Sequence, residues 1–288
     1  MPKIIFVFFD HISVSIKKEE DGFMYYTDYH MHTSFSADSE APMEDMIRAA
    51  IDNGLEEIAF TDHVDFDPRY THPDYNLYIP YLEELKFKYK KDITIRLGIE
   101  VGLENTKADL VNTITAAFPF DFIIGSSHSV KCLDLYFDQN EYFSTRTKQE
   151  AYNTYFEEML LNIRTCTDFC VYGHLDFVSR YGLYNDNSVN YMEFAPLIDA
   201  VLKELIERGK GIEINTSGYR YGIDGCYPSL DILKRYKALG GEIITVGSDA
   251  HFAKDVGDHI KEAYELLLAA GFRHVTVFKG RKPSFITL

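Results

Sequence analysis

Short apolar segments alternate with longer amphipathic segments along almost the whole chain, and this alternation restricts the fold more than any other feature. The apolar segments are rich in Ile, Val and Phe and have the length of strands, at residues 25–32, 57–61, 93–99, 121–125, 169–172, 211–215, 242–246 and 274–278. Helical patterns lie between them, at residues 43–53, 79–90, 105–116, 147–166, 191–208, 230–239 and 255–270. This alternation predicts a parallel sheet covered by helices. Seven or eight such units favour a closed, TIM-like α/β barrel over an open sheet.

The same pattern indicates one domain preceded by an extension. The chain contains no linker, internal repeat or low-complexity stretch, so residues 23–288 are predicted to form a single domain. Residues 1–22 show no clear hydrophobic period, and we interpret them as an N-terminal extension of unknown role. Several predicted helices end at a glycine, which favours a left-handed C-cap; these are Gly54, Gly209, Gly240 and Gly271.

The balance of charges limits the partners that this chain can bind. Its 288 residues include 45 Asp and Glu against 29 Lys and Arg, which gives a formal net charge of −16. Affinity for the phosphate backbone of nucleic acids needs clustered Lys and Arg, so we do not expect the chain to bind nucleic acid. A small anionic substrate is compatible with this charge, because bound metal ions would add positive charge.

Cysteine content and hydropathy favour a cytoplasmic location. The apolar run at residues 4–9 is shorter than a signal-peptide core, which has about 7–15 apolar residues. No segment approaches the ~20 apolar residues of a membrane span, so no contact with a membrane is expected. The cysteines are too few for a disulfide scaffold and are expected to be buried thiols: Cys132, Cys166, Cys170 and Cys226.

Histidines and carboxylates lie at or just after the C-terminal ends of the predicted strands. His30-Met31-His32 places two imidazoles two residues apart, and hence on one face of a strand. Asp249-Ala250-His251 repeats this spacing near the other end of the chain. Other strand ends and the loop after the first strand supply Asp38, His63, Glu100, His128 and His174. Because these ends converge in a parallel barrel, we expect the side chains to form one site.

This mixture of imidazoles and carboxylates predicts a metal centre. Zn, Fe and Mn all accept such ligands. Nine candidate ligands exceed the four of one tetrahedral zinc, so two or three divalent ions are expected. Bridging carboxylates such as Glu100 and Asp249 would hold the ions about 3.5–4 Å apart, a separation typical of two-metal phosphoryl chemistry. The alternative is an unrelated scatter of structural histidines.

At these positions the sequence resembles the PHP (polymerase and histidinol phosphatase) superfamily. The resemblance runs in order from about residue 25 to the C-terminus. The segments that carry it are His30-Met31-His32, Thr61-Asp62-His63, Gly98-Ile99-Glu100, Ser127-His128, Gly173-His174 and Asp249-Ala250-His251. Others look specifically like the histidinol-phosphate phosphatases: His32-Thr33-Ser34-Phe35-Ser36, Gly173-His174-Leu175-Asp176-Phe177 with Arg180-Tyr181, and Glu213-Ile214-Asn215-Thr216-Ser217-Gly218.

The resemblance implies a distorted (β/α)7 barrel, a trinuclear metal cluster and a phosphatase activity. The eighth strand candidate, at residues 274–278, would then be an edge or cover strand outside the barrel. The implied reaction is hydrolysis of L-histidinol phosphate to L-histidinol and phosphate in histidine biosynthesis, by attack of a metal-bridging hydroxide on phosphorus. The implied metal ligands are His30, His32, Asp38, His63, Glu100, His128, His174, Asp249 and His251.

Further residues are expected to contact the substrate. Arg180 is the candidate clamp on phosphate, because a guanidinium binds phosphate oxygens in pairs. Arg220 and Ser36 are additional substrate-binding candidates, and Asp38 or His63 would protonate the leaving group. An acidic rim would suit the ammonium group of the substrate, and its candidate residues are Asp65, Asp67 and Asp134.

Three alternatives stay open at this point. Another PHP phosphoesterase would act on phosphotyrosine, a sugar phosphate or a nucleotide. A metal-dependent amidohydrolase also begins with His-x-His on a barrel strand, but such enzymes typically use a bridging lysine and a lone aspartate, where this chain has Glu100 and Asp249-Ala250-His251. A non-enzymatic metal-binding module is the third, although its signature would be an incomplete ligand set.

Overall fold

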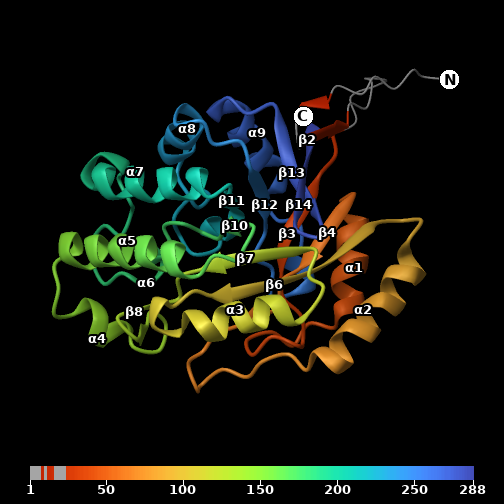
Figure 1. The fold of residues 1–288 in the computed structure, drawn as a ribbon, viewed down its shortest axis with the longest axis horizontal. Helices are drawn as coiled ribbons and strands as arrows, with labels where there is room; N and C mark the ends of the chain where they lie inside the picture. The colour runs from red at the N-terminus through yellow and green to blue at the C-terminus, as the bar shows by residue number, and fades with distance from the viewer. Residues whose placement is uncertain (1–7, 10–11, 16–23) are drawn as a thin grey trace.

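A parallel sheet curls almost into a closed barrel at the centre of the molecule (Figure 1). The computed structural model describes residues 8–9, 12–15 and 24–288. The strand order in the sheet is β12-β11-β10-β7-β6-β4-β3, with the short β5 beside β6. The bounds are β3 (Thr27–Met31), β4 (Glu57–Phe60), β5 (His63–Val64), β6 (Thr94–Gly102), β7 (Phe122–Ser126), β10 (Val171–Tyr172), β11 (Gly211–Asn215) and β12 (Ile244–Gly247). This architecture confirms the predicted TIM-like α/β barrel.

The two ends of the sheet meet just beyond β12. Met31 forms a parallel bridge with Ala250. His32 donates its backbone N–H to the Ala250 carbonyl at 2.9 Å, and Asp249 donates its own to the His30 carbonyl at 2.8 Å. These bonds place the His-x-His segment directly beside the Asp-x-His segment, which lies 219 residues further along the chain.

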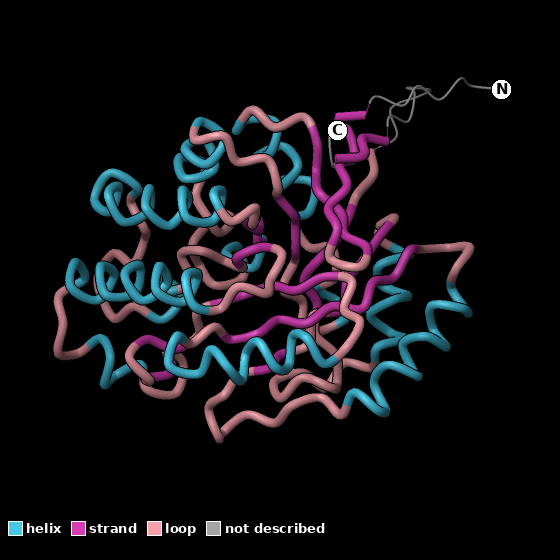
Figure 2. Tube along the Cα trace, in the orientation of Figure 1, coloured by secondary structure: helices cyan, strands magenta, loops and turns pink. Residues whose placement is uncertain are grey.

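Helices surround the sheet, and the strands form the wall of the barrel (Figure 2). Their apolar faces pack against the sheet, as α1 does through Met46, Ile47 and Ala50. The bounds are α1 (Met43–Asp52), α2 (Tyr75–Tyr89), α3 (Ala108–Ala117), α4 (Gln139–Phe143), α5 (Lys148–Thr165), α6 (Val178–Tyr181), α7 (Tyr191–Glu207), α8 (Leu230–Ala238) and α9 (Ile260–Ala270). The four glycines predicted to end helices all have positive φ.

Several element bounds differ from the predicted ones. Helix α2 begins four residues early, because the Asp74 side chain accepts a bond from the Asn76 N–H and caps it there. Helix α9 begins five residues late, since His259 has a left-handed φ of 53° that interrupts a helical path. Strand β6 runs past residue 99, so Glu100 lies inside the strand. Helices α4 and α6, strands β5, β8 (Ser129–Val130) and β9 (Leu133–Asp134), and the short helices η1 (Asn105–Lys107), η2 (Thr216–Tyr219) and η3 (Ala253–Asp255) were not predicted as separate elements.

A second, smaller sheet contains the C-terminal hairpin. Strand β13 (His274–Lys279) pairs antiparallel with β14 (Lys282–Thr287), and β14 pairs in parallel with β2 (Ile12–Ser15), followed by β1 (Phe8–Phe9). The eighth predicted strand therefore lies outside the barrel, as expected. The strands β1 and β2 fall within the predicted N-terminal extension, and the rest of residues 1–22 is outside the described residues. A domain boundary at residue 23 stays a prediction.

The prediction for the cysteines is confirmed in part. Cys166, Cys170 and Cys226 are buried, whereas Cys132 is exposed. In the part of the chain that the structure describes, no helix is both long and apolar enough to cross a membrane.

Candidate metal centre

Glu100 lies at the middle of a cluster of histidines at the C-terminal end of the barrel. Its Oε2 lies 3.0 Å from His30 Nε2 and 3.2 Å from His63 Nδ1. Its Oε1 lies 2.9 Å from His174 Nε2 and 3.2 Å from His128 Nε2. The carboxylate is fully buried, and Ser126 donates a hydrogen bond to Oε1 at 2.6 Å. One side chain thus faces ring nitrogens from four other positions in the sequence.

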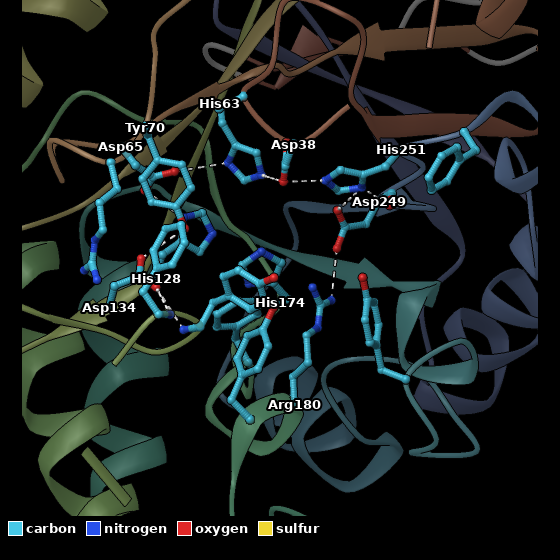
Figure 3. A pocket seen from close by; sticks show the side chains of 18 residues that line it. Asp38, His63, Asp65, Tyr70, His128, Asp134, His174, Arg180, Asp249 and His251 are labelled. Atoms are coloured by element: carbon cyan, nitrogen blue, oxygen red, sulfur yellow. Dashed lines mark hydrogen bonds and ion pairs between the residues drawn. The ribbon is translucent and has the colours of Figure 1, made fainter. Parts of the chain in front are cut away.

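Asp38 extends the cluster on the side of the cavity. Figure 3 shows its carboxylate between His63 and His251. Asp38 Oδ2 lies 2.9 Å from His251 Nε2 and 3.4 Å from His63 Nε2. The His32 ring stacks between the same two imidazoles, with ring centroids 4.3 Å from His63 and 4.1 Å from His251. Asp249 completes this part, with Oδ1 3.3 Å from His32 Nε2.

The donor atoms are close enough to bind more than one metal ion. Within each of several overlapping groups, one ligand atom per residue lies within 4.8 Å of the others. The groups are His32, Asp38, His63 and His251; His30, His174 and Asp249; His30, His32 and Glu100; His63, Asp65 and His128; and Glu100, His128 and His174. Together they contain all nine predicted ligands, with Asp65 as a further candidate.

The pKa values of His32, His174 and Glu100 favour the binding of metal cations. Burial, together with the neighbouring His251 and His63, lowers the pKa of His32 to about 3, so its ring is neutral. Burial also lowers the pKa of His174. Burial raises the pKa of Glu100, but His30 and the other histidines outweigh it and hold that pKa well below its usual range. His32 and His174 are therefore neutral imidazoles beside an ionised carboxylate. Burial lowers the pKa of His30, His63 and His128, but the neighbouring carboxylates outweigh it and raise these pKa values above the usual one.

Buried nitrogen atoms without hydrogen bonds support the same conclusion. Among the described residues, His32 Nε2, His63 Nδ1 and His174 Nδ1 are buried and have no hydrogen-bond partner. Two of them, His32 Nε2 and His63 Nδ1, face carboxylate oxygens at 3.3 Å and 3.2 Å outside hydrogen-bond geometry. Leaving such groups unpaired is costly, and coordination to a divalent ion would satisfy these two. The donor set and its geometry fit a bound metal.

A cavity of about 500 Å³ opens beside the cluster (Figure 3). Its wall near the cluster includes Asp38, His63, His128, His174, Asp249 and His251. The remaining wall is largely aromatic and was not predicted, and it includes Tyr70, Tyr136, Phe137, Phe177, Tyr181, Tyr221 and Phe252. Tyr136 and Phe137 belong to the stretch between β9 and α4, where the abundance of aromatic residues was the available signal.

Arg180 lines the cavity beside Asp249. Its Nη2 donates to Ser217 Oγ at 2.5 Å and to Asp249 Oδ2 at 3.0 Å, and its guanidinium lies 4.1 Å from the Tyr221 ring centroid. Burial lowers the pKa of Arg180, but the Asp249 carboxylate outweighs this effect and raises it, so the side chain is a cation. Its Nε has no hydrogen-bond partner among the described residues.

Arg220 and Ser36, both predicted to bind substrate, are not among the side chains that line the cavity. Arg220 donates to the backbone carbonyls of Ser248 and Asp249, and to Asp258 Oδ2 at 3.2 Å. Ser36 Oγ accepts the His63 N–H at 2.8 Å and lies 3.2 Å from His32 Nδ1. With their polar atoms engaged in this way, the geometry favours a structural role over the predicted substrate contact.

The predicted acidic rim is also engaged within the protein. Asp65 Oδ1 lies 2.8 Å from His128 Nδ1, directly behind the cluster. Asp67 pairs with Arg69 at 2.6 Å. Asp134 accepts hydrogen bonds from the Tyr70 hydroxyl and from two backbone N–H groups. These three carboxylates organise the cavity wall, and of the three only Asp65 and Asp134 line it.

Comparison with known families decides the classification. The family model "PHP domain" matches residues 28–217. The chain belongs to the PHP family. The match begins in β3 and ends in η2, so it contains most of the proposed ligands of this PHP protein. Asp249 and His251 follow the matched residues, and barrel closure brings them to the same centre.

Individual PHP relatives are similar over almost their whole length. The chain is 36% identical to the histidinol-phosphatase of Lactococcus lactis subsp. lactis over 88% of this chain and 95% of the relative. It is 32% identical to a probable histidinol-phosphatase of Clostridium acetobutylicum, over 83% and 91%.

A solved structure shows the same PHP fold. The Lactococcus lactis histidinol phosphate phosphatase, in complex with zinc, L-histidinol and phosphate, matches with a TM-score of 0.84 and 33% identity. The match covers 90% of this chain and 98% of that one. A putative histidinol phosphatase from Listeria monocytogenes matches with a TM-score of 0.70 at 20% identity, which supports the fold alone.

Proposed function

We propose that this PHP protein is a metal-dependent phosphatase that hydrolyses L-histidinol phosphate to L-histidinol and phosphate. The observation that carries the proposal is the complete set of nine convergent His, Asp and Glu side chains beside the cavity. Its similarity to a relative that was solved with zinc, L-histidinol and phosphate selects the substrate. The proposed cytoplasmic location follows from the same biosynthetic reaction.

The metal ions would be held by the overlapping groups around Glu100. The proposed ligands are His30, His32, Asp38, His63, Glu100, His128, His174, Asp249 and His251. Two or three divalent ions of Zn, Fe or Mn, when bound, would supply positive charge for the phosphate oxygens and would lower the pKa of a coordinated water. The chain contributes imidazoles and carboxylates whose ligand atoms already converge at this end of the barrel.

Arg180 binds the phosphate group in this proposal. Its guanidinium is fixed by Ser217 and Asp249, while its Nε is free of partners within the described residues. A fixed cation binds a phosphate oxygen with little loss of conformational entropy. Asp249 therefore has two roles, as a ligand in the cluster and as the anchor of Arg180.

The leaving oxygen needs a proton, and the cavity wall offers two groups for it. Asp38 and His63 lie 3.4 Å apart and both line the cavity. Both border the same cavity as Arg180, in which the ester oxygen would lie. The aromatic wall formed by Tyr136, Phe177 and Tyr181 would surround the imidazole of the substrate and exclude water from it.

A panel of phosphate esters tests the proposal. Phosphate release by metal-loaded protein is measured with L-histidinol phosphate, phosphotyrosine, a sugar phosphate and a nucleotide, while elemental analysis counts the metals. A strong preference in kcat/KM for L-histidinol phosphate, with two to three metals per chain, supports the proposal. Preference for another ester would assign the chain to a different PHP phosphoesterase, and activity on an amide instead would favour an amidohydrolase.

A further inference from the structure

Glu213 is a buried carboxylate that lies outside the candidate metal groups and outside the cavity wall. It is the third residue of β11 and is fully buried. Glu213 Oε1 lies 2.6 Å from His30 Nδ1. Glu213 Oε2 accepts the His174 backbone N–H at 2.9 Å and the Asn215 amide at 3.1 Å. One carboxylate thus joins β11 to the His30 imidazole and to the loop that begins at His174.

These contacts determine which nitrogen of His30 keeps its proton when a metal ion binds. Both partners of Glu213 Oε2 are donors, so that oxygen acts as an acceptor. An ionised carboxylate is acceptor-only, and Oε1 therefore accepts from His30 Nδ1–H. A neutral imidazole with its proton on Nδ1 has its lone pair on Nε2. His30 Nε2 lies 3.0 Å from the ionised Glu100 Oε2, so it also donates a proton in the metal-free protein. A bound metal ion would displace that proton and take the lone pair of Nε2, while Nδ1–H stays with Glu213.

The backbone leaves room for this close pair. A Cβ atom built on Gly247 of β12 would contact both His30 Cβ and Glu213 Oε1 at overlapping distances. Any larger residue at this position would separate the imidazole from the carboxylate. The absence of a side chain at position 247 therefore allows the approach between β3 and β11.

Asp65 also places a carboxylate oxygen against the Nδ1 of a proposed ligand histidine, on the other side of Glu100. It lies 2.8 Å from His128 Nδ1, and His128 Nε2 lies 3.2 Å from Glu100. Asp65, however, lines the cavity and is itself a candidate ligand. Glu213 contacts the proposed ligands through the His30 ring and the His174 backbone. The Asn215 amide that donates to Glu213 also lies 3.4 Å from His30 Nδ1.

We propose that Glu213 is a positioning residue that holds His30 in the Nδ1–H tautomer, with Nε2 directed at the metal centre, and thereby strengthens metal binding. This inference rests on the proposed function. Carboxylates that accept the second ring N–H of a ligand histidine orient the ring, and removing them typically weakens metal affinity about 10- to 100-fold.

Glu213→Gln tests the proposal, because one amide cannot replace the carboxylate here. If the oxygen of the new amide accepts from His30, the NH₂ group of that amide faces the His174 N–H, and two hydrogen-bond donors then oppose each other. If the amide rotates, its NH₂ group faces His30 Nδ1 and favours the tautomer with a proton on Nε2. We expect zinc affinity, measured by competition with a chromophoric chelator, to fall about 10- to 100-fold.

Glu57→Gln is the matched control. Glu57 is also buried in the sheet and accepts hydrogen bonds from Tyr29 and Arg96, but at the opposite end of the barrel. We expect Glu57→Gln to leave zinc affinity unchanged. If Glu213→Gln fails to fold, as judged by unfolding of the metal-free protein, Glu213→Asp gives the same readout, since the shorter side chain withdraws the carboxylate from His30 Nδ1.

A His30→Ala background separates positioning from a general loss of structure. There, Glu213→Gln should change zinc affinity by less than about twofold, because no imidazole remains to be oriented. Unchanged zinc affinity of Glu213→Gln in the wild-type background, or an equal loss with and without His30, would overturn the proposal. The proposed function can fail without this proposal failing. If the wild-type protein binds zinc but prefers another ester, the substrate assignment is wrong, whereas the role of Glu213 in zinc binding still stands.

Discussion

Met31 and Ala250 form the bridge that joins the first strand of the barrel to the segment after the last one. The flanking residues are all proposed metal ligands: His30 and His32 on one side, and Asp249 and His251 on the other. Asp249 has a left-handed φ of 56° and donates its N–H to the His30 carbonyl. The barrel therefore closes at its metal centre, and changes at this junction should affect metal binding and folding together.

Gly247→Ala should disturb this junction. The added methyl group would overlap His30 Cβ and Glu213 Oε1, and such overpacking typically costs about 1–3 kcal/mol. Denaturant unfolding of the metal-free protein measures the loss, and metal affinity should fall as well. Gly225→Ala is the control, because a Cβ there meets no described atom within 4 Å. Equal stability of the two variants would contradict the packing described at Gly247.

His128→Ala should remove at least one metal ion and nearly all turnover. Its Nε2 lies 3.2 Å from Glu100 and its ring lines the cavity. Elemental analysis and phosphate release, measured on the same sample, check both effects. His274→Ala, far along the chain in β13, should change neither. Full metal content and normal activity in His128→Ala would remove this residue from the centre.

Arg180→Ala should raise KM for L-histidinol phosphate. Loss of a hydrogen bond to a charged group costs about 1.5–3 kcal/mol, which corresponds to about a 10- to 100-fold increase. Steady-state kinetics with metal-saturated protein gives the value, and circular dichroism checks folding. Arg235→Ala is a suitable control, because Arg235 pairs with Asp199 outside the cavity. A KM equal to that of wild type would exclude a phosphate contact for Arg180.

Asp38→Asn tests which group supplies the proton to the leaving oxygen. An alkyl leaving group needs protonation, whereas p-nitrophenolate leaves without it. If Asp38 is the donor, kcat should fall about 100-fold or more with L-histidinol phosphate and far less with p-nitrophenyl phosphate. Metal content, measured in parallel, detects loss of a ligand. An equal fall with both substrates at full metal content would favour His63 as the donor.

The thiols should differ sharply in their reactivity. Burial raises the pKa of Cys170 to about 11 and that of Cys226 to about 12, and Cys166 is also buried with a raised pKa. At pH 8 these groups are protonated and inaccessible, whereas the thiolate is the reactive form. A thiol reagent should therefore modify the exposed Cys132 in the folded protein, and all four cysteines after unfolding. Cys132→Ser should abolish the reaction of the folded state.

Much of the barrel could be predicted because its signals are periodic and repeated. The strands β3, β4, β6, β7, β10, β11 and β12 each lie in a segment that the apolar pattern predicts, and the polar residues that follow identify the end of the barrel that carries the site. Glu100 shows the limit of this reasoning, since β6 continues past it and Glu100 lies within the strand. The predicted convergence of the ligands holds although β6 extends past Glu100, because the neighbouring strands still end at the same end of the barrel.

The cavity wall and the outer carboxylates depend on contacts that the sequence pattern does not encode. Helices α4 and α6 have five and four residues, too few to show a helical period. Yet α6 contains Tyr181 and α4 begins two residues after Phe137, and both aromatic residues line the cavity. Asp65 was predicted to contact the ammonium group of the substrate, but in the structure its carboxylate contacts His128 Nδ1. Glu213 stands between apolar residues in a strand, and its contact with His30 spans 183 positions in the chain.

Closure of the barrel through Met31 and Ala250 also has a consequence for the order of events during synthesis. The first histidines leave the ribosome more than 200 residues before Asp249 and His251, so the complete centre can assemble only after nearly the whole chain has been translated. Contacts of such long range form slowly. Binding of the full set of metal ions is therefore a late step of biogenesis. A chain truncated before β12 would contain the early histidines but would lack Asp249 and His251.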